Sequence, residues 1–213
     1  MNSFETFFPS TLRDPGRGQA FLFIGPMFAS KTKEMLNALD RYDYVKPSVQ
    51  VLLFKYHKDT RETDGAVRSR NGAARKPTST VSTGEELWGK VWDCVVNGGA
   101  STLVVGVDEA QFIRNLRFFV ERVIDHRALF PNTTILLYMA ALDSTFKRQM
   151  WPEIVEVLPL CNGVRKLTAI CGTCQQREAQ LTRRDVDSAE LELIGSKESY
   201  TATCFICHNI QPT

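Results

Sequence analysis

The residues with the clearest chemistry form one short segment, Gly-Pro-Met-Phe-Ala-Ser-Lys-Thr, which follows an apolar run and precedes a helical pattern. In that position backbone N–H groups can hold phosphate oxygens, the lysine can reach the β- and γ-phosphates, and the threonine hydroxyl can bind Mg²⁺. Ser30 stands where the pattern G-x-x-x-x-G-K-[ST] has its second glycine, so we expect its Cβ to restrict the backbone. A plain strand-to-helix turn with a solvated lysine is the alternative. The predicted phosphate loop consists of Gly25, Pro26, Met27, Phe28, Ala29, Ser30, Lys31 and Thr32.

Two adjacent acids, Asp108 and Glu109, follow the apolar run that starts at Thr102. Phosphate-loop enzymes place a Mg²⁺-organising acid at the end of such a strand. Because side chains alternate along a strand, we expect Asp108 to face the metal and Glu109 to face a second substrate, from whose hydroxyl it can accept a proton. The alternative is a pair of solvated acids that cap the next helix.

Two C-x-x-C pairs near the end of the chain have the spacing of metal knuckles. Four thiolates suit one tetrahedral Zn²⁺, and a closed set of four ligands indicates a structural ion. His208 is a conceivable substitute ligand, and two separate or redox-active thiol pairs are the alternative. We expect the other two cysteines, Cys94 and Cys161, to be small buried hydrophobic residues. The predicted zinc ligands are Cys171, Cys174, Cys204 and Cys207.

The elements that must position these groups are predicted from five apolar runs and three helical patterns. The runs cover residues 20–24, 49–54, 102–107, 134–140 and 166–170, and their continuous character is typical of a parallel sheet covered on both faces. Helical periodicity covers residues 31–42, 85–96 and 115–127, with Ser30 or Ala29 as the expected cap of the first helix. Residues 62–82 are almost without apolar side chains and predict one long loop. This alternation indicates an α/β domain.

Length and composition predict a flexible leader at residues 1–18, an α/β nucleotide-binding domain at 19–168 and a small metal-binding subdomain at 169–213. The formal net charge of +2 gives no reason to expect a nucleic-acid or membrane-surface partner. The longest apolar run, residues 135–142, is far shorter than the roughly 18 residues that a membrane span needs. No secretion signal is recognisable and the cysteines have metal spacing, so we expect a cytoplasmic protein.

Several segments, taken in order, closely resemble the type II thymidine kinases, which are cellular cytosolic and large-DNA-virus enzymes. They are G-P-M-F-A-x-K-T from Gly25, the stretch from Lys55 to Arg61, Asp108-Glu-Ala-Gln-Phe112, the stretch from Ala140 to Phe146, and the cysteine quartet. The resemblance runs from about Ala20 to His208. It implies a P-loop NTPase-type, RecA-like parallel sheet flanked by helices, and a zinc-binding subdomain that carries a lasso-like loop. It also implies transfer of the γ-phosphate of ATP to the 5′-hydroxyl of thymidine.

The resemblance also implies roles for individual residues. Glu109 would be the general base, and Lys31, Thr32 and Asp108 would organise the phosphates and Mg²⁺. Trp151 stands where the family has a phenylalanine. Further positions near the phosphate-bearing ligand are Asp59, Thr60, Arg61 and Gln111. The implied thymidine site consists of Met27, Phe112, Leu142, Phe146, Trp151, Thr182, Leu191, Glu192, Leu193, Ile194, Gly195 and Tyr200.

The implied partners are ATP with Mg²⁺, thymidine, a structural Zn²⁺ and three further copies of the chain in a homotetramer. Thymidine triphosphate would act as a feedback inhibitor, and the location would be the cytoplasm, that of the host if the protein is viral. Two alternatives stay open from the residues. One is a P-loop ATPase that grips nucleic acid through a zinc ribbon, and the other is a nucleotide-binding protein weakened in catalysis by Ser30.

Overall fold

A six-stranded sheet forms the centre of the molecule in the computed structural model, which describes residues 18–45, 48–59, 65–68, 74–187 and 198–209. The strand order is β5-β2-β6-β7-β1-β8, and every neighbouring pair is parallel. All seven residues of β6 are buried, as expected for a strand covered on both faces. The parallel sheet predicted from continuous apolar runs is confirmed. Its strands are β1 (Gln19–Gly25), β2 (Val49–Tyr56), β5 (Ser79–Val81), β6 (Thr102–Asp108), β7 (Thr134–Leu142) and β8 (Gly163–Lys166).

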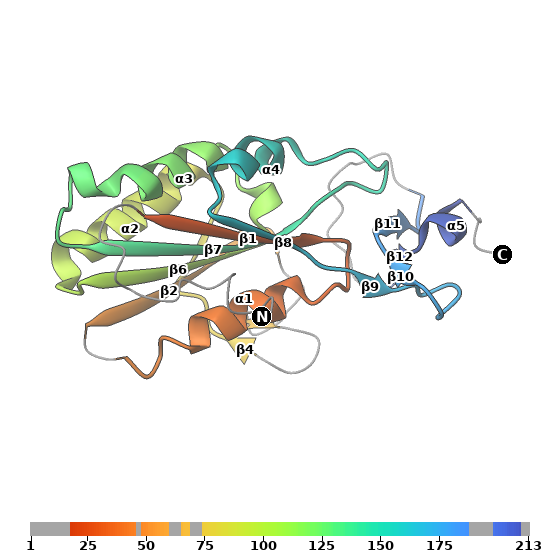
Figure 1. The fold of residues 1–213 in the computed structure, drawn as a ribbon, viewed down its shortest axis with the longest axis horizontal. Coiled ribbons are helices and arrows are strands. Elements are labelled where there is room, and N and C mark those ends of the chain that lie inside the picture. Colours follow the sequence, from red (N-terminus) through yellow and green to blue (C-terminus); the bar gives the residue numbers. More distant parts are fainter. Residues whose placement is uncertain (1–17, 46–47, 60–64, 69–73, 188–197, 210–213) are drawn as a thin grey trace.

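Helices cover both faces of this sheet (Figure 1). Helix α1 lies on one face, while α2, α3 and α4 lie on the other, and a separate buried cluster of apolar side chains fills each layer. A Cβ at Gly106 would lie 2.6 Å from the Leu39 side chain, so this glycine lets α1 approach the sheet closely. The α/β class is therefore confirmed. The helices are α1 (Lys31–Asp40), α2 (Gly84–Gly98), α3 (Leu116–Asp125) and α4 (Pro152–Val157), with 3₁₀ turns at Ala110–Phe112, His126–Ala128 and Leu158–Leu160.

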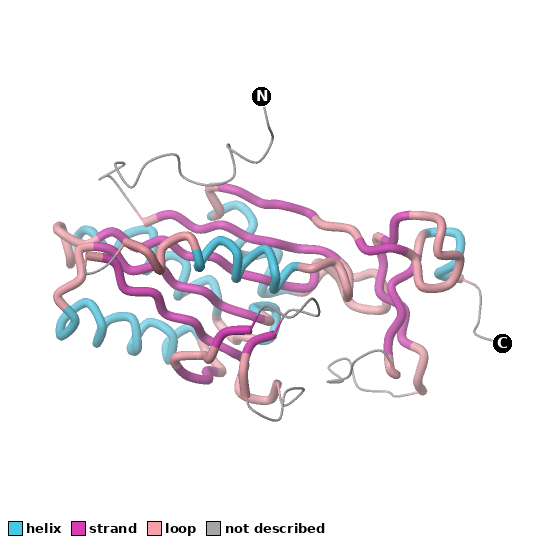
Figure 2. Tube along the Cα trace, turned by 90° about the horizontal axis from the view of Figure 1, so that it is seen from below, coloured by secondary structure: helices cyan, strands magenta, loops and turns pink. Residues whose placement is uncertain are grey.

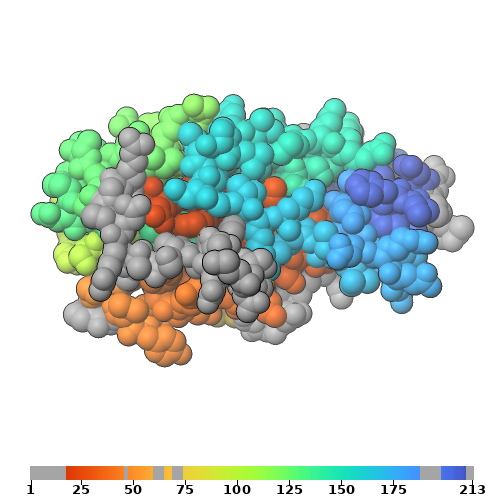
Figure 3. All heavy atoms as spheres, viewed as in Figure 1, coloured from red at the N-terminus to blue at the C-terminus, as the bar shows by residue number. Residues whose placement is uncertain are grey.

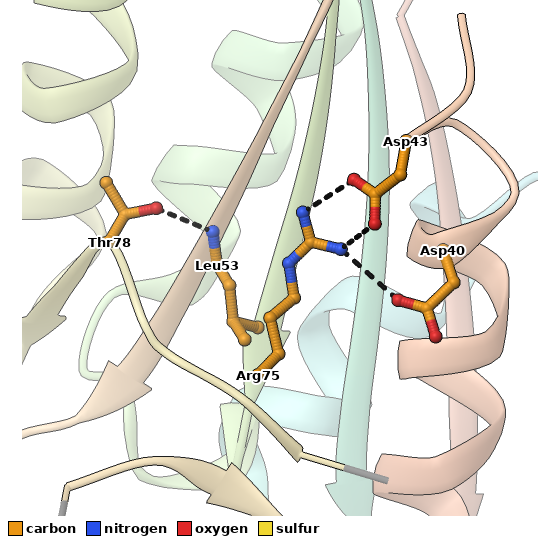
Figure 4. A network of polar contacts seen from close by, with 5 residues as sticks. All are labelled: Asp40, Asp43, Leu53, Arg75 and Thr78. Carbon is orange, nitrogen blue, oxygen red and sulfur yellow. Dashed lines mark hydrogen bonds and ion pairs between the residues drawn. The ribbon is translucent and has the colours of Figure 1, made fainter.

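The segment predicted as one long loop contains strands where the structure describes it, so this prediction is wrong in part. β3 (Val67–Arg68) pairs with β4 (Ala74–Arg75), and β5 extends the main sheet beside β2. Two hydrogen bonds join Thr78 to β2. Its N–H donates to the Leu53 carbonyl over 2.7 Å. Its hydroxyl accepts from the Leu53 N–H over 3.0 Å (Figure 4). Backbone pairing does not require apolar side chains, which explains why periodicity missed these strands.

A small lobe at one end of the elongated molecule follows the main sheet (Figures 1 and 3). The strand predicted at residues 166–170 is in fact two strands, because β8 ends at Lys166 and β9 (Ala169–Ile170) belongs to the lobe. β9 pairs with β10 (Glu178–Ala179), and β11 (Leu181–Arg184) pairs with β12 (Tyr200–Thr203), both antiparallel. Figure 2 shows the lobe beyond the end of the main sheet, with the short helix α5 (Phe205–His208) on its outer side. The division of the chain at residues 168 and 169 stays a prediction.

Details at the helix ends and the single cysteines also differ from expectation. Ser30 does occupy the cap position of α1, but its side chain makes no capping hydrogen bond because its backbone is left-handed. Cys94 and Cys161 are only half-buried, at the margin of the core. Burial nevertheless raises the pKa of the Cys161 thiol to about 12.

The predicted leader lies outside the described residues except for Gly18, which is buried and donates its N–H to the Ile124 carbonyl over 3.3 Å. None of the helices in the described part of the chain is long and apolar enough to cross a membrane.

Candidate functional site

The predicted phosphate loop leaves β1 at Gly25 and enters α1 after Ser30. A Cβ at Gly25 would lie 2.3 Å from the Leu167 carbonyl oxygen, and the backbone there has φ +152°, so only glycine fits. Ser30 has φ 62° and ψ 23°, in the left-handed region that the glycine of the general pattern adopts without steric cost. The serine therefore enters α1 in a conformation that disfavours a Cβ.

Two polar contacts define how this loop is held. The Lys31 ammonium donates to the Pro26 carbonyl over 2.7 Å, so it lies across the loop. The Met27 N–H donates to the Thr182 hydroxyl of β11 over 2.9 Å. This hydrogen bond joins the loop to the C-terminal lobe.

The end of β6 brings the first predicted acid to the start of α1. The Thr32 hydroxyl donates to Asp108 Oδ1 over 2.9 Å, and Asp108 is buried. Lys55 is the register partner of Asp108 on the neighbouring strand β2, so the two side chains leave the same face of the sheet. The hydroxyl and carboxylate that were predicted to organise Mg²⁺ thus meet, and oxygen ligands of this kind suit that cation.

The second acid, Glu109, is fixed by Gln111. Glu109 lies in the turn directly after β6 and has φ 53°. Its left-handed backbone differs from the backbone of Asp108, which is the last residue of the strand. Gln111 Nε2 donates to Glu109 Oε2 over 2.7 Å, and Gln111 Oε1 accepts the Leu142 N–H over 3.0 Å. Because the β7 amide occupies its oxygen, the Gln111 amide is oriented with its NH₂ group toward Glu109. Gln111, expected near the phosphate-bearing ligand, here links the acid to the end of β7.

An aromatic wall follows the acidic pair in the same 3₁₀ turn. The Phe112 ring lies 5.3 Å from that of Tyr56 and 5.2 Å from that of Trp151, the latter edge-on at 81°. The Trp151 indole N–H is buried, and among the described residues it has no hydrogen-bond partner. Met27 and Leu142 are half-buried at the ends of β1 and β7. The rings of Tyr56, Phe112 and Trp151 thus meet near the carboxyl ends of the strands, where open α/β sheets bind ligands.

The other predicted thymidine residues lie where the C-terminal lobe meets the main domain. Thr182 and Tyr200 are buried on β11 and β12, and Phe146 is half-buried in the segment after β7. Asp59 is described, and its carboxylate lies 3.6 Å from the Lys55 ammonium. The remaining predicted residues, Thr60, Arg61 and the lasso positions Leu191, Glu192, Leu193, Ile194 and Gly195, lie outside the described residues.

The four predicted metal ligands come together in the lobe. The sulfur atoms of Cys171, Cys174, Cys204 and Cys207 all lie within 4.8 Å of one another. Tetrahedral Zn²⁺ with bonds of about 2.3 Å to sulfur needs such a spacing, so the donor set fits the ion. The His208 Nδ1 atom instead lies 3.0 Å from the Thr203 hydroxyl, and the quartet is made of cysteines alone.

Two thiols of the cluster differ in pKa. Burial acts to raise the pKa of Cys171, but backbone N–H groups of Cys174, Cys204 and Thr173 stabilise its thiolate and bring the pKa down to about 6. Burial and the neighbouring sulfurs raise the pKa of Cys207 to about 12. The Cys207 thiol thus holds its proton strongly and the Cys171 thiol holds its proton weakly. A bound cation would displace both protons because it needs thiolate ligands.

The cysteine lobe packs directly on the phosphate loop. Ala29 is buried in one apolar cluster with Cys171, Cys204 and Cys207, and Phe28 packs against the same cluster. Together with the Met27–Thr182 hydrogen bond, this contact makes the loop and the lobe neighbours in space. Sequence patterns alone did not indicate this contact.

Sequence patterns did not indicate two cationic residues near the predicted site residues, Lys55 and Arg184. Lys55 is buried with 2% exposure, although lysine is seldom buried without a partner. Its position at the end of an apolar strand, four residues before Asp59, was a usable signal. Arg184 contacts both Phe146 and Tyr200. Arg184 lies two residues after Thr182 on one strand, and residues with this spacing share a face. That spacing was a usable signal for Arg184.

Comparison with known proteins agrees with this arrangement. The sequence profile described as "Thymidine kinase" matches residues 18–208. The thymidine kinase of myxoma virus (strain Lausanne) is 34% identical over 191 residues, which are 90% of this chain and 96% of the viral protein. The chain belongs to the thymidine kinase family. The cytosolic thymidine kinases of Gallus gallus and Homo sapiens are 32% and 31% identical, over 91% and 90% of this chain and 79% and 74% of their own lengths.

Membership of the thymidine kinase family confirms the resemblance that the motifs indicated. A member of the family is a kinase, with ATP and thymidine as its substrates. The phosphate loop and the acidic pair are the parts of this chain with the chemistry for the phosphate donor, and the cysteine quartet is a group that could hold a metal.

Proposed function

We propose that this thymidine kinase transfers the γ-phosphate of ATP to the 5′-hydroxyl of thymidine at the carboxyl ends of β1, β2, β6 and β7. The juxtaposition of Thr32, Asp108, Glu109 and Gln111 carries the proposal. The hydroxyl and carboxylate oxygens of Thr32 and Asp108 suit a metal, and the neighbouring Glu109 carboxylate accepts a hydrogen bond from the oriented Gln111 amide, which supports this proposal. Phosphoryl transfer needs mainly positioning and charge stabilisation, which this arrangement supplies.

On the donor side, the backbone from Gly25 to Thr32 holds the phosphates of ATP. The Lys31 ammonium exchanges its bond to the Pro26 carbonyl for the β- and γ-phosphate oxygens. Thr32 and Asp108 would hold Mg²⁺, which would neutralise phosphate charge when bound with ATP. Asp59, Thr60 and Arg61 serve the phosphate-bearing ligand, with the arginine fork suited to a phosphoryl group.

On the acceptor side, Glu109 is the general base for the 5′-hydroxyl. Gln111 acts through Glu109, because its hydrogen bonds to that carboxylate and to the Leu142 N–H fix where the base lies. Flat apolar contacts hold the thymine. They come from Met27, Phe112, Leu142, Phe146 and Trp151. The proposed nucleoside site also includes Thr182, Tyr200 and the lasso residues Leu191, Glu192, Leu193, Ile194 and Gly195.

Zinc is the metal that we propose for the quartet of Cys171, Cys174, Cys204 and Cys207. Four thiolate ligands leave no open position, so the ion would brace the lobe and supply no reacting group. The contact of the cysteine cluster with Ala29 supports a second role for this brace, which is to support the phosphate loop.

At the level of the whole protein, we propose a homotetramer that is inhibited by thymidine triphosphate bound at the nucleoside site, as the resemblance of the motifs implies. The chicken and human relatives are named cytosolic, which supports a cytoplasmic location, that of the host if the protein is viral. With a formal net charge of +2 we propose no nucleic-acid or membrane partner.

The test is a transfer assay with ATP labelled at the γ-phosphate, Mg²⁺, and thymidine, deoxyuridine or deoxycytidine as acceptor. The expected product is thymidine 5′-monophosphate carrying the label. ATP hydrolysis that is stimulated by DNA or RNA, with no labelled nucleotide, would support the nucleic-acid ATPase instead. Product formed only after the Ser30→Gly change would support the catalytically weakened nucleotide-binding protein. Family membership favours neither alternative.

A further inference from the structure

Arg184 lies in the middle of a cluster formed by two predicted thymidine residues. Its guanidinium carbon is 4.0 Å from the centroid of the Phe146 ring and 5.4 Å from that of the Tyr200 ring. Its Nη2 also donates to the Tyr200 hydroxyl over 2.9 Å. One half-buried cation thus joins the segment after β7 to strand β12 of the lobe.

The register of the β11–β12 ribbon explains how Arg184 reaches this place. Arg184 lies opposite Tyr200, and Thr182 lies opposite Ala202. Because side chains alternate along each strand, Thr182, Arg184 and Tyr200 share one face of the ribbon. Thr182 on that face accepts the Met27 N–H of the phosphate loop, so the face looks toward the main domain.

The opposite face of the same ribbon contacts the cysteine knuckles. Arg183 donates to Asp185 over 2.8 Å, to the Cys207 carbonyl over 3.2 Å and to the Thr173 hydroxyl over 3.5 Å. Cys207 and Thr173 belong to the two C-x-x-C knuckles. The two faces of the ribbon therefore differ. The face with Arg183 contacts both cysteine knuckles, and the face with Arg184 carries predicted nucleoside residues.

We propose that Arg184 is a positioning residue of the nucleoside site, which fixes the Phe146 ring and the Tyr200 hydroxyl so that a pyrimidine nucleoside meets a preformed wall. This proposal rests on the proposed function. A planar guanidinium can stack on one ring while it donates to the hydroxyl of the other, and a lysine ammonium cannot do both with the same geometry. Without this side chain the two rings would have to be ordered by the ligand, at a cost in affinity.

The variants separate the stacking from the charge. Arg184→Met keeps an unbranched stem and removes the charge, the planar group and the donor. Arg184→Lys keeps the charge and an N–H donor but removes the planar group, and it serves as the deciding variant if Arg184→Met does not fold. Lys147→Met is the matched control, because Lys147 is exposed and its ammonium lies 5.6 Å from the centroid of the same Phe146 ring.

Each variant of the full chain is compared in three measurements: thymidine and ATP KM, the rise in melting temperature on adding thymidine, and bound zinc. We expect both Arg184 variants to raise the thymidine KM about tenfold and to lose most of the thymidine-induced thermal shift, with ATP KM and zinc content unchanged. A thymidine KM within about twofold of the parent in the folded Arg184 variants would overturn the proposal, as would an equal rise in Lys147→Met. If the parent itself gives no transfer and no thermal shift with thymidine, the proposed function fails, and Arg184 has no nucleoside to position.

Discussion

Ser30 has a left-handed backbone, which is sterically unfavourable for a residue with a Cβ. A left-handed backbone costs a residue with a Cβ about 1–2 kcal/mol, whereas glycine adopts it freely but loses more chain entropy on folding. We therefore expect Ser30→Gly to increase the free energy of unfolding by about 0.5–1 kcal/mol, as measured by urea denaturation. Ser30→Ala retains the Cβ and should match the parent. A less stable Ser30→Gly protein would show that the serine side chain stabilises the loop.

Lys55 is a buried cation whose described partners include the Asp59 carboxylate at 3.6 Å and the Ala66 carbonyl at 3.5 Å. Replacing it by methionine leaves a carboxylate with 7% side-chain exposure beside an apolar group. Since removing one partner of a buried ion pair is strongly destabilising, we expect Lys55→Met to lower the free energy of unfolding by about 3 kcal/mol.

The double variant Lys55→Met, Asp59→Asn is the control for this interaction. Because the uncompensated charge is gone, the double variant should be more stable than Lys55→Met alone. Additive losses from the two single changes would mean that the two charges do not stabilise each other.

At the scale of elements, Arg75 holds the β3–β4 hairpin to the end of α1. Its guanidinium makes two hydrogen bonds to Asp43, both 2.9 Å, and one to Asp40 at 3.2 Å (Figure 4). We expect Arg75→Gln to speed amide hydrogen exchange in β3 and β4 while global stability falls by no more than about 1 kcal/mol, because the pair is partly exposed.

Arg117→Gln is the matched control for this ion pair, since Arg117 pairs with Glu121 at 2.8 Å within a single helix. It should leave exchange in the hairpin unchanged. An unchanged hairpin in Arg75→Gln would show that the apolar contacts of Val67, which is buried against the α1 layer, are sufficient to hold it.

The elements that sequence could predict are those with a strong local pattern. The continuous apolar run at Thr102–Asp108 and the helical face of α1 were sufficient for a parallel α/β sheet. β5 escaped prediction because its pairing with β2 uses backbone groups that every residue has. The break between β8 and β9 escaped as well, because an apolar run does not indicate which residues pair with which strand.

The candidate site shows the same limit. Spacing identified the phosphate loop, the acidic pair and the cysteine quartet, because each is local in sequence. The bond between Met27 and Thr182 joins residues that are far apart in the chain and follows from tertiary packing alone. Likewise, the hydrogen bond that the Gln111 amide oxygen accepts from the Leu142 N–H of β7 joins distant parts of the chain and follows from tertiary packing.

At the scale of the whole molecule, the cysteine lobe contacts the phosphate loop, and we propose that this contact couples a metal held by the quartet to both substrates. Ala29 and the cysteines share one buried cluster, so disorder in the lobe would reach the loop. We expect removal of zinc by a chelator to weaken ATP binding as well as thymidine binding, measured by titration of each ligand into the treated protein. A Cys94→Ser variant, altered outside the lobe, should bind both ligands as the parent does. Loss of thymidine binding alone would mean that the lobe does not support the loop.

We propose that Glu109 accepts the proton of the 5′-hydroxyl while thymidine and ATP bind beside it. The most direct measurement is the rate of γ-phosphate transfer to thymidine by Glu109→Gln, with the dissociation constants of both substrates determined on the same protein. General-base catalysis predicts that kcat falls by at least about 100-fold while both dissociation constants stay within about threefold of the parent. A Glu109→Gln protein that transfers phosphate to thymidine at close to the parent rate would contradict the account.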